Sequence, residues 1–312
     1  MLNLFRARAN SPYTVVFGIR RTKVNIVVVE NASSQPSLVV SDECVVSGDD
    51  IVAAMRKLSH DYQKYCRHHP RLALVLGAGL YQSVTLDRPQ LSDAELSASL
   101  RYQLSDLVTF DTEDCISDYY ELPTQVQGQH KIHAIATSRK QLEPLLQVAH
   151  ELSDQLQGVF AEEQALATVL ENLNEPAALV YQQPQQAALV QVYNNGELQV
   201  NRAVRSLEKL SELSIEEIRM GGLQPLSVEI QRSADYFERQ LRQRPIASVY
   251  LALPLPKQQE VLDRLHEDLG FEIAWATYPS WAQELANGDY SDFPALGGAL
   301  LAQQNDAQET SS

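Results

Sequence analysis

Cysteine and positive charge are both scarce in this chain of 312 residues. Its three cysteines, Cys44, Cys66 and Cys115, are odd in number and far apart, so they fit neither a disulfide framework nor a paired metal-binding motif and indicate a reducing compartment. Lys and Arg number 25 against 40 Asp and Glu, which gives a formal net charge of -15. Because nucleic-acid affinity rests mainly on Lys and Arg, this balance argues against a nucleic-acid partner and against attachment to anionic lipid by charge alone.

Long apolar runs are also missing. The longest, such as residues 26–29 and 72–76, fall far below the roughly 18 residues that a membrane-spanning helix needs. The first residues, MLNLFRARANSP, contain arginines without a following apolar core, so they do not have the pattern of a secretory signal. These absences predict a cytoplasmic protein without direct membrane insertion, which reaches a membrane only through a partner.

One pattern is present twice, in residues 13–30 and in residues 177–203. Each copy is a β-rich meander with tight polar turns, followed by a helical segment and a further strand. Asn194-Asn195-Gly196 is a strong hairpin signal in the second copy. With 44% hydrophobic residues and a length that suits two lobes of about 150 residues each, the chain predicts an α/β fold of two ribonuclease H-like lobes with a cleft between them.

The other segments predict an insertion and a C-terminal return. Ser92 and Glu95 form a capping box that starts a helix, and strands follow near residues 115–122 and 131–136, so residues 84–139 are expected to form a small α+β subdomain. The first lobe is expected in residues 1–83 and 140–176, and the second lobe in residues 177–280. Residues 281–302 are predicted to form a helix that packs back on the first lobe, and the polar residues 303–312 a disordered tail.

Three strings together resemble one known family. They are SDAELSASLRYQLSDLVTFDTEDCISDYYEL in residues 92–122, EIQRSADYFERQ in residues 229–240 and FPALGGALLAQ in residues 293–303. Their order and spacing, which cover nearly the whole chain, resemble the PilM-like family of actin-like proteins in type IV pilus and type II secretion machines. The resemblance implies an actin-like, two-lobed fold in which residues 84–139 replace the usual small subdomain of actin.

The resemblance also implies a function. An unfused chain that begins MLNLF and lacks nucleotide motifs is most similar to the branch of the family that serves the mannose-sensitive haemagglutinin pilus. It implies an adaptor at the cytoplasmic face of the inner membrane, which binds the N-terminal cytoplasmic peptide of a PilN-like assembly protein in a groove between the first lobe and the insert. Leu104, Val108 and Phe110 are candidate lining residues of that groove, or else core residues of the insert.

The first turn of the first copy lacks the acid that nucleotide chemistry needs. Actin-like ATPases place an Asp and a Gly in the first turn of each lobe, because the Asp holds Mg²⁺ through water and the Gly lets backbone N–H groups approach phosphates. Here the turn has Gly18, Ile19 and Arg20, and Lys23 matches a family position, but no acidic residue is present. The metal-anchoring carboxylate of this lobe is missing.

The second copy departs from the family in the same way. Tyr181 and Gln183 stand where the family has its Asp and Gly, and the adenosine-side glycine pair is replaced by Ala252-Leu253-Pro254-Leu255-Pro256. Side chains at these positions fill space that a nucleotide needs. The resemblance with these departures implies a protein that is not an enzyme and has neither ATP nor Mg²⁺ as a cofactor.

The sequence is also compatible with two other functions. One is an ATP-regulated switch whose lobes close on nucleotide, and the other is a sugar or small-acid kinase on the same fold. The two turn carboxylates distinguish these functions from the adaptor, and their absence favours the adaptor.

A few local signals have competing interpretations. Arg20, Arg21 and Lys23 form either an anion site at the first turn or a solvated hairpin tip. Gly77-Ala78-Gly79 suggests a phosphate loop, but without a helix directly after it a simple turn is favoured. The histidines match no zinc spacing, so no metal site is predicted.

Overall fold

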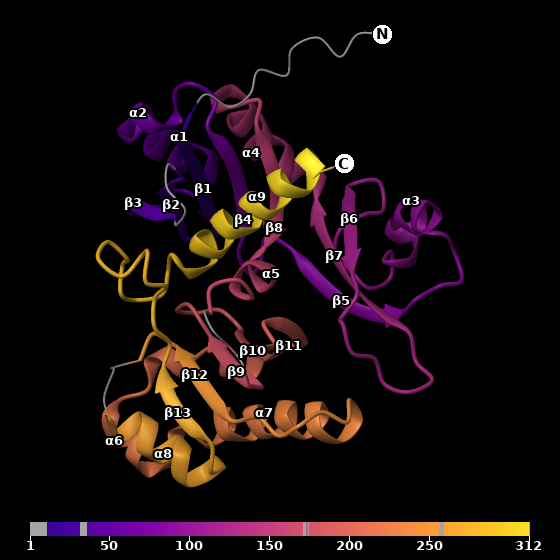
Figure 1. Ribbon diagram of the computed structural model, residues 1–312, viewed down its shortest axis with the longest axis vertical. Helices are drawn as coiled ribbons and strands as arrows, with labels where there is room; N and C mark the ends of the chain where they lie inside the picture. Colours follow the sequence, from indigo (N-terminus) through magenta and orange to yellow (C-terminus); the bar gives the residue numbers. More distant parts are fainter. Residues whose placement is uncertain (1–10, 32–35, 171–172, 174, 256–258, 312) are drawn as a thin grey trace.

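The computed structural model describes residues 11–31, 36–170, 173, 175–255 and 259–311. The string MLNLF, the start of the expected first lobe at residues 1–10, and Pro256 lie outside the described residues. Figure 1 shows two lobes stacked along the long axis and a smaller unit, which contains β5, β6, β7 and α3, beside the first lobe.

The first lobe is built on a five-stranded sheet in the order β3-β2-β1-β4-β8. Strands β1 to β3 pair antiparallel, whereas β4 and β8 run parallel to β1. Because successive side chains of a strand point to opposite faces, Val15 and Phe17 pack against α1 and α4 while Val16 faces α9. The elements are β1 (Tyr13–Ile19), β2 (Lys23–Glu30), β3 (Ser37–Val45), α1 (Ile51–Asp61), α2 (Gln63–Cys66), β4 (Arg71–Leu76), α4 (Arg139–Leu152), β8 (Leu156–Ala161), α5 (Glu162–Leu166) and α9 (Phe293–Ser311).

The second lobe repeats this sheet, with the order β11-β10-β9-β12-β13. One face of the sheet packs against α7 and α8, and the other face contributes Tyr181 and Tyr193 to a core that also contains residues of α5 and α9. The doubled meander of the sequence therefore corresponds to two sheets of the same topology. The elements are β9 (Ala177–Tyr181), β10 (Ala188–Asn194), β11 (Glu197–Val204), α6 (Ile215–Glu217), α7 (Gln224–Asp235), β12 (Ser248–Ala252), α8 (Gln259–Leu269) and β13 (Glu272–Trp275).

Two local predictions are confirmed by backbone geometry. Asn195 and Gly196 both have positive φ, 53° and 78°, as the tight turn between β10 and β11 requires. Ser92 caps its helix by accepting from the Glu95 N–H, while the Glu95 carboxylate accepts from the Ser92 N–H. Residues close together in the sequence therefore determine the turn between β10 and β11 and the start of the helix after Ser92.

The unit beside the first lobe is a three-stranded antiparallel sheet in the order β5-β7-β6, covered on one face by α3. Cys115, Ile132 and Ala134 point to the helix side and pack against Leu96 and Leu100. The opposite face of the sheet is directed at the first lobe through Ile116 and Tyr120, and His133 on the same face also contacts Asn201 of the second lobe. The elements are β5 (Gln82–Asp87), α3 (Asp93–Gln103), β6 (Cys115–Tyr120) and β7 (Lys131–Ser138).

The C-terminal helix differs from its predicted bounds at both ends. It was predicted for residues 281–302, but α9 begins only at Phe293, because Gly288 and Tyr290 adopt positive φ (79° and 63°) that a right-handed helix excludes. The helix then continues to Ser311 through residues predicted as a disordered tail, where Ala, Gln and Glu are good helix formers.

Close packing holds α9 on the first lobe. A Cβ atom at Gly297 would lie 1.9 Å from the carbonyl oxygen of Ala165, and one at Gly298 would lie 2.4 Å from Cγ2 of Val75. Glycine is therefore required at both positions for the helix to approach α5 and β4 so closely.

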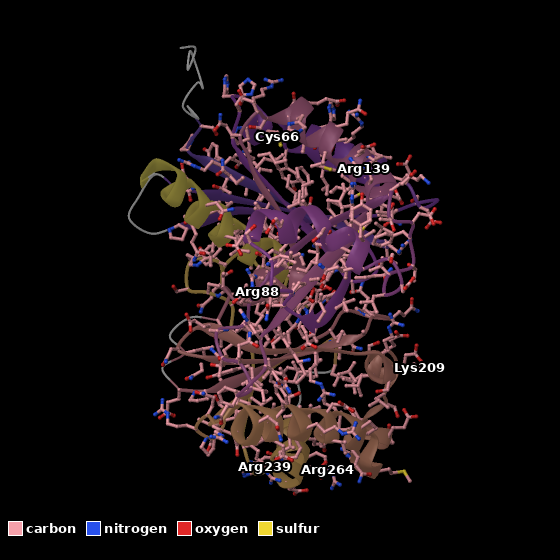
Figure 2. All side chains as sticks on the ribbon, turned by 90° about the vertical axis from the view of Figure 1, so that its right-hand side faces the viewer. Cys66, Arg88, Arg139, Lys209, Arg239 and Arg264 are labelled. Atoms are coloured by element: carbon pink, nitrogen blue, oxygen red, sulfur yellow. The ribbon has the colours of Figure 1, made fainter. Side chains whose placement is uncertain are left out.

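Charged side chains are distributed over the surface and paired locally. Figure 2 shows Arg88, Arg139 and Arg239 well separated from one another. Arg88 forms an ion pair with Asp93, and Arg139 with Glu143. Within the described ranges, no helix combines the length and the apolar character that a membrane span requires.

Candidate functional site

The first turn of the first lobe sends its arginine into the cleft rather than into solvent. The backbone N–H of Arg20 donates to the carbonyl of Lys23 over 2.9 Å, which closes the hairpin between β1 and β2. The side chain of Arg20 is only 3% exposed. The prediction of a solvated hairpin tip is therefore wrong for Arg20.

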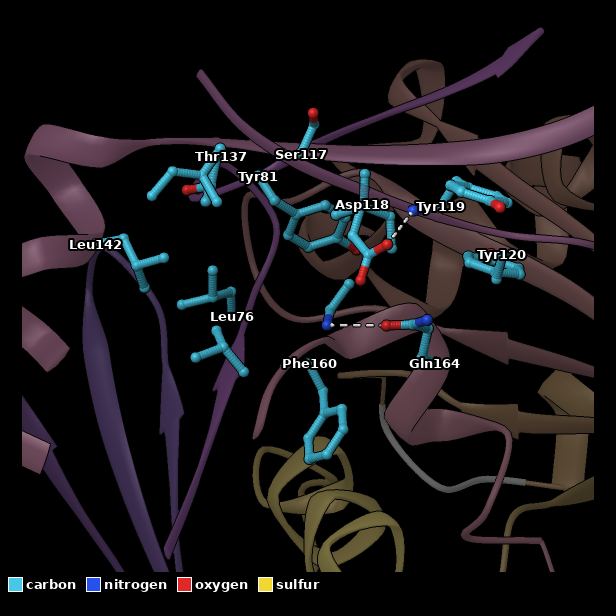
Figure 3. Close-up of a pocket in the computed structure, with 14 residues that line it drawn as sticks. Leu76, Tyr81, Ser117, Asp118, Tyr119, Tyr120, Thr137, Leu142, Phe160 and Gln164 are labelled. Atoms are coloured by element: carbon cyan, nitrogen blue, oxygen red, sulfur yellow. Dashed lines mark hydrogen bonds between the residues drawn. The ribbon is translucent and has the colours of Figure 1, made fainter. Parts of the chain in front are cut away.

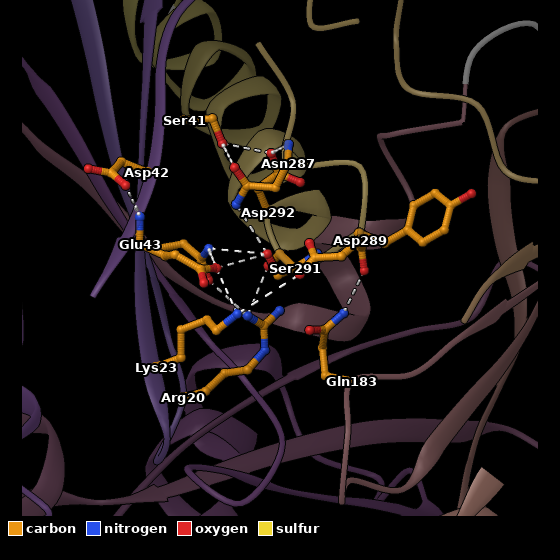
Figure 4. Close-up of polar contacts among 12 residues, drawn as sticks. Arg20, Lys23, Ser41, Asp42, Glu43, Gln183, Asn287, Asp289, Ser291 and Asp292 are labelled. Atoms are coloured by element: carbon orange, nitrogen blue, oxygen red, sulfur yellow. Dashed lines mark hydrogen bonds and ion pairs between the residues drawn. The ribbon is translucent and has the colours of Figure 1, made fainter. Parts of the chain in front are cut away.

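The guanidinium of Arg20 joins the two lobes. Its Nη1 donates to Oδ1 of Asn25 over 3.0 Å and to the carbonyl of Ser291 over 2.9 Å (Figure 4). Its Nη2 donates over 2.5 Å to the hydroxyl of Tyr181, at the end of β9. The two turns that the sequence singled out are thus in direct contact through Arg20 and Tyr181.

A buried carboxylate balances this arginine. Oε2 of Glu162, at the start of α5, lies 3.7 Å from Nε of Arg20, and Oε1 accepts from the N–H of Ala78 over 2.6 Å. Burial raises the pKa of Glu162 above its ordinary value, although the charge of Arg20 opposes the shift. Burial likewise raises the pKa of the Tyr181 hydroxyl, which remains protonated and accepts from the arginine. The Gly77–Gly79 turn thus binds a protein carboxylate through Ala78.

The other residues of the two turns are also occupied by protein groups. Nζ of Lys23 lies 2.7 Å from Oε2 of Glu43 and 4.0 Å from Oδ2 of Asp289. The side-chain amide of Gln183, which is buried, donates to the carbonyl of Asp289 over 3.3 Å (Figure 4). The loop before α9 therefore closes over both turns.

The glycine of the first turn and the neighbouring arginine both contact protein groups. A Cβ atom at Gly18 would lie 3.3 Å from Cβ of Ala295, so this glycine serves the packing of α9. Arg21 donates from Nε and Nη2 to the carbonyl of Gly79. The anion-site interpretation of Arg20, Arg21 and Lys23 gains no support from these contacts.

The adenosine-side loop is filled by its own side chains. Leu253 and Leu255 are 1% and 6% exposed and belong to the core of the second lobe. Ile19 is fully buried on the opposite side of the first-lobe sheet from α9. These positions contribute to packing, with no side-chain group presented to a ligand.

The cleft residues as arranged do not fit Mg²⁺ with a triphosphate. Arg20 and Tyr181 are in contact between the two turns, and Mg²⁺ requires oxygen ligands that neither a guanidinium nor a protonated phenol supplies well. Among the described residues, no group of three or more His, Cys, Asp and Glu side chains is arranged to hold a metal ion. That the protein binds no nucleotide stays a prediction.

An open pocket lies next to this filled cleft, between the first lobe and the β5-β7-β6 sheet. Its volume is about 350 Å³, and two edge strands, β6 and β8, contribute to its walls (Figure 3). Most of the lining side chains are apolar or aromatic. The lining residues are Leu76, Tyr81, Ile116, Ser117, Asp118, Tyr119, Tyr120, Ile135, Thr137, Leu142, Val159, Phe160, Ala161 and Gln164.

Glu163 organises one end of the pocket. Its carboxylate accepts from the hydroxyl of Tyr120 over 3.1 Å and from that of Tyr81 over 3.3 Å, and it lies 3.1 Å from Nε2 of His133. Burial acts to raise the pKa of Glu163, but the interactions with His133, together with hydrogen bonds from Asn201 and Tyr120, hold this pKa below its ordinary value. A buried carboxylate with these partners fixes the β5-β7-β6 sheet against the first lobe.

The predicted lining residues do not line this pocket. Leu104 is fully buried in the core under α3, and Val108 packs against the same core. Phe110 contributes to a separate pocket of about 260 Å³ that also involves Arg21 and Thr109. These side chains lie on the α3 side of the sheet, whereas the alternation of Ile116, Asp118 and Tyr120 in β6 was the signal for the residues that face the first lobe.

Comparison with known proteins supports the fold. No protein-family model and no curated protein sequence matches the chain. Among solved structures, a PilM-PilN type IV pilus biogenesis complex matches with a TM-score of 0.62 and 14% identity, over 94% of this chain and 98% of that chain. The cytoplasmic domain of EpsL, an inner-membrane component of the type II secretion system of Vibrio cholerae, matches with a TM-score of 0.51 and 15% identity, over 95% of both chains.

A third similar structure belongs to a protein with an actin-like ATPase fold. A Bacteroides thetaiotaomicron protein described as having an actin-like ATPase fold and unknown function matches with a TM-score of 0.51 and 11% identity, over 88% of this chain and 93% of that chain. The chain therefore has the actin-like α/β fold that the sequence predicted.

Proposed function

We propose that this chain is a non-catalytic actin-like adaptor in type IV pilus biogenesis, of the MshI type that serves the mannose-sensitive haemagglutinin pilus. It binds the N-terminal cytoplasmic peptide of a PilN-like inner-membrane assembly protein. The observation that carries the proposal is the combination of a filled cleft with an open pocket beside it. Arg20 and Tyr181 meet in the cleft, while the pocket of about 350 Å³ lies between β6 and β8, each an edge strand of its sheet in the described part of the chain.

The filled cleft supports an adaptor over an ATP-binding switch of the same machine. For a nucleotide to enter, the side chain of Arg20 must leave its acceptors on Asn25, Ser291 and Tyr181. When Arg20 leaves, Glu162 becomes a buried carboxylate without its cation, and this loss costs several kcal/mol of free energy. The chain therefore retains the actin-like frame for its surfaces rather than for hydrolysis.

The pocket suits an extended peptide. Its volume lies within the range of about 300–1,000 Å³ that is usual for ligand pockets. Strands β6 and β8 are edges of their sheets among the described residues, so a peptide that adds to either edge gains main-chain hydrogen bonds while its side chains enter the pocket.

Two similar structures support a place at a membrane-bound machine. One is a complex of PilM with PilN, and the other is the cytoplasmic domain of an inner-membrane component of a secretion system. By this analogy, the chain is held at the cytoplasmic face of the inner membrane through its partner.

Peptide titration tests the proposal. Fluorescently labelled peptides that tile the cytoplasmic segments of the inner-membrane pilus proteins from the same genome are titrated with the full chain, without nucleotide. One segment is expected to bind, and Ile116→Asp, which places a charge on the apolar wall of the pocket, abolishes this binding. Val45→Asp is the matched control, because Val45 is a 68% exposed residue on edge strand β3. If no segment binds, or if Ile116→Asp binds normally, the proposal fails.

A further inference from the structure

Asp118 occupies a distinctive position among the residues that line the pocket. Side chains alternate along β6, so Ile116, Asp118 and Tyr120 share the face directed at the first lobe, whereas Cys115 and Tyr119 pack on the α3 side. Asp118 is exposed and stands between an aliphatic and an aromatic neighbour. The pocket therefore presents a carboxylate flanked by two apolar surfaces.

The tyrosines of the pocket present their rings rather than their hydroxyls. Both Tyr81 and Tyr120 donate their hydroxyl protons to the buried carboxylate of Glu163. Ser83 donates to the same carboxylate, and His133 contacts it from β7. Because these hydroxyls are bound to Glu163, the aromatic end of the pocket offers an apolar surface. Glu163 is therefore a positioning residue that orients the rings of Tyr81 and Tyr120.

The charge of the pocket has one sign. Among its lining residues Asp118 is the one with a formal charge. Its Oδ1 accepts from the N–H of Tyr119 over 2.8 Å, and within the described part of the chain Oδ2 accepts no hydrogen bond from protein. This oxygen is available for an external donor, and a cationic donor forms a stronger hydrogen bond with it than a neutral one.

Resting on the proposed function, we propose that the pocket selects an extended segment with an apolar side chain for the Tyr81–Tyr120 surface and a Lys or Arg side chain for Asp118. Cytoplasmic segments next to membrane spans are rich in Lys and Arg, so the tail of an inner-membrane protein carries the complementary charge. The net charge of -15 attracts such a tail over a longer range. The acidic surface and the apolar pocket together exclude an acidic segment.

Selection from a displayed library of random 12-residue peptides tests this specificity. The full chain, Asp118→Asn and Asp87→Asn are each used as the target. Asp87 is the matched control, because it is an 83% exposed Asp on β5, the opposite edge of the same sheet. Peptides recovered with the wild-type chain are expected to combine apolar residues with a Lys or Arg at a fixed distance, and Asp118→Asn is expected to lose the basic preference while Asp87→Asn keeps it.

Affinity measurements on one recovered peptide complete the test. Replacing its basic residue with Gln is expected to weaken binding to the wild-type chain by about three- to fivefold, as for a partly exposed ion pair, and to leave binding to Asp118→Asn unchanged. Salt is expected to weaken wild-type binding more than Asp118→Asn binding.

The outcomes separate this inference from the proposed function. Recovered peptides that require Ile116 but show no basic preference overturn the role of Asp118 and leave the peptide adaptor intact. A selection without any peptide that is sensitive to Ile116→Asp contradicts both. Glu163→Gln supplies a further readout, because it weakens the hydrogen bonds that hold the tyrosine hydroxyls. The variant is expected to prefer a Leu-containing peptide over its Leu→Ser counterpart by a smaller affinity ratio than the wild-type chain does.

Discussion

The guanidinium of Arg20 donates a hydrogen bond of 2.5 Å to the hydroxyl of Tyr181, and in doing so joins the two turns that face each other across the actin-like cleft. Here a cation from one lobe and a phenol from the other form the bridge within a single chain. The lobes are therefore connected without a ligand.

Arg20→Ala is expected to destabilise the fold strongly. The substitution leaves Glu162 as a buried carboxylate without its cation, a change that costs about 3–5 kcal/mol. Urea unfolding followed by circular dichroism measures this cost. Arg21→Ala is the matched control, because Arg21 is exposed and contacts the carbonyl of Gly79, and its effect is expected to stay within about 0.5 kcal/mol. Equal effects of the two substitutions would refute the bridging role of Arg20.

Tyr181→Phe is expected to be destabilising by a smaller amount. It removes the acceptor of Nη2 of Arg20 but keeps the aromatic packing of the buried ring, so the cost is that of one unsatisfied buried donor, about 1–3 kcal/mol. A double-mutant cycle with Arg20→Ala isolates the interaction. A coupling energy near zero would show that the hydrogen bond contributes nothing to stability.

The buried carboxylate of Glu163 predicts a specific pH dependence. Its pKa in the folded protein is held below its ordinary value, so its contribution to stability is fully present above about pH 4.3, the unfolded value, and is lost as the pH falls through the folded-state pKa. Glu163→Gln is therefore expected to flatten the acid limb of the stability curve. The control is Glu143→Gln, since Glu143 is 60% exposed. An unchanged acid slope in Glu163→Gln would contradict this assignment.

Gly297→Ala is expected to disturb the packing of α9. The added methyl group meets the carbonyl oxygen of Ala165 at 1.9 Å, so the helix must shift away from α5, at a cost of about 1–3 kcal/mol. Thermal melting measures the change, with Gln304→Ala on the exposed face of the same helix as control. A melting temperature equal to that of the wild-type chain would mean that α9 does not approach α5 as closely as described.

The short-range features of this protein could be predicted from its sequence. The doubled meander, the capping box at Ser92 and the hairpin at Asn195 depend on residues that lie close together in the chain, where propensity and turn chemistry act directly. The missing acids of the two turns were also visible, since they are properties of single positions.

The sequence could not predict which groups replace those acids. Arg20 turns inward because Tyr181 and Glu162, which are more than a hundred residues away along the chain, receive its guanidinium, and no local pattern records such a contact. From its place near the end of a helix, Leu104 could be either a groove-lining or a core residue, and its contacts with Leu96 and Leu100 place it in the core under α3. The start of α9 was misplaced because the loop before it is ordered by Tyr278, whose hydroxyl accepts from the N–H groups of Gly288 and Tyr290.

The central claim is that the chain binds a cytoplasmic peptide of an inner-membrane pilus protein without nucleotide. Isothermal titration of the purified full chain with the segment identified by peptide titration, with and without millimolar Mg-ATP, tests it most directly. The account predicts that one peptide binds per chain without nucleotide, that Mg-ATP changes neither the affinity nor the melting temperature, and that Ile116→Asp abolishes binding. Peptide binding that requires Mg-ATP, or a melting temperature that rises with Mg-ATP, would contradict it.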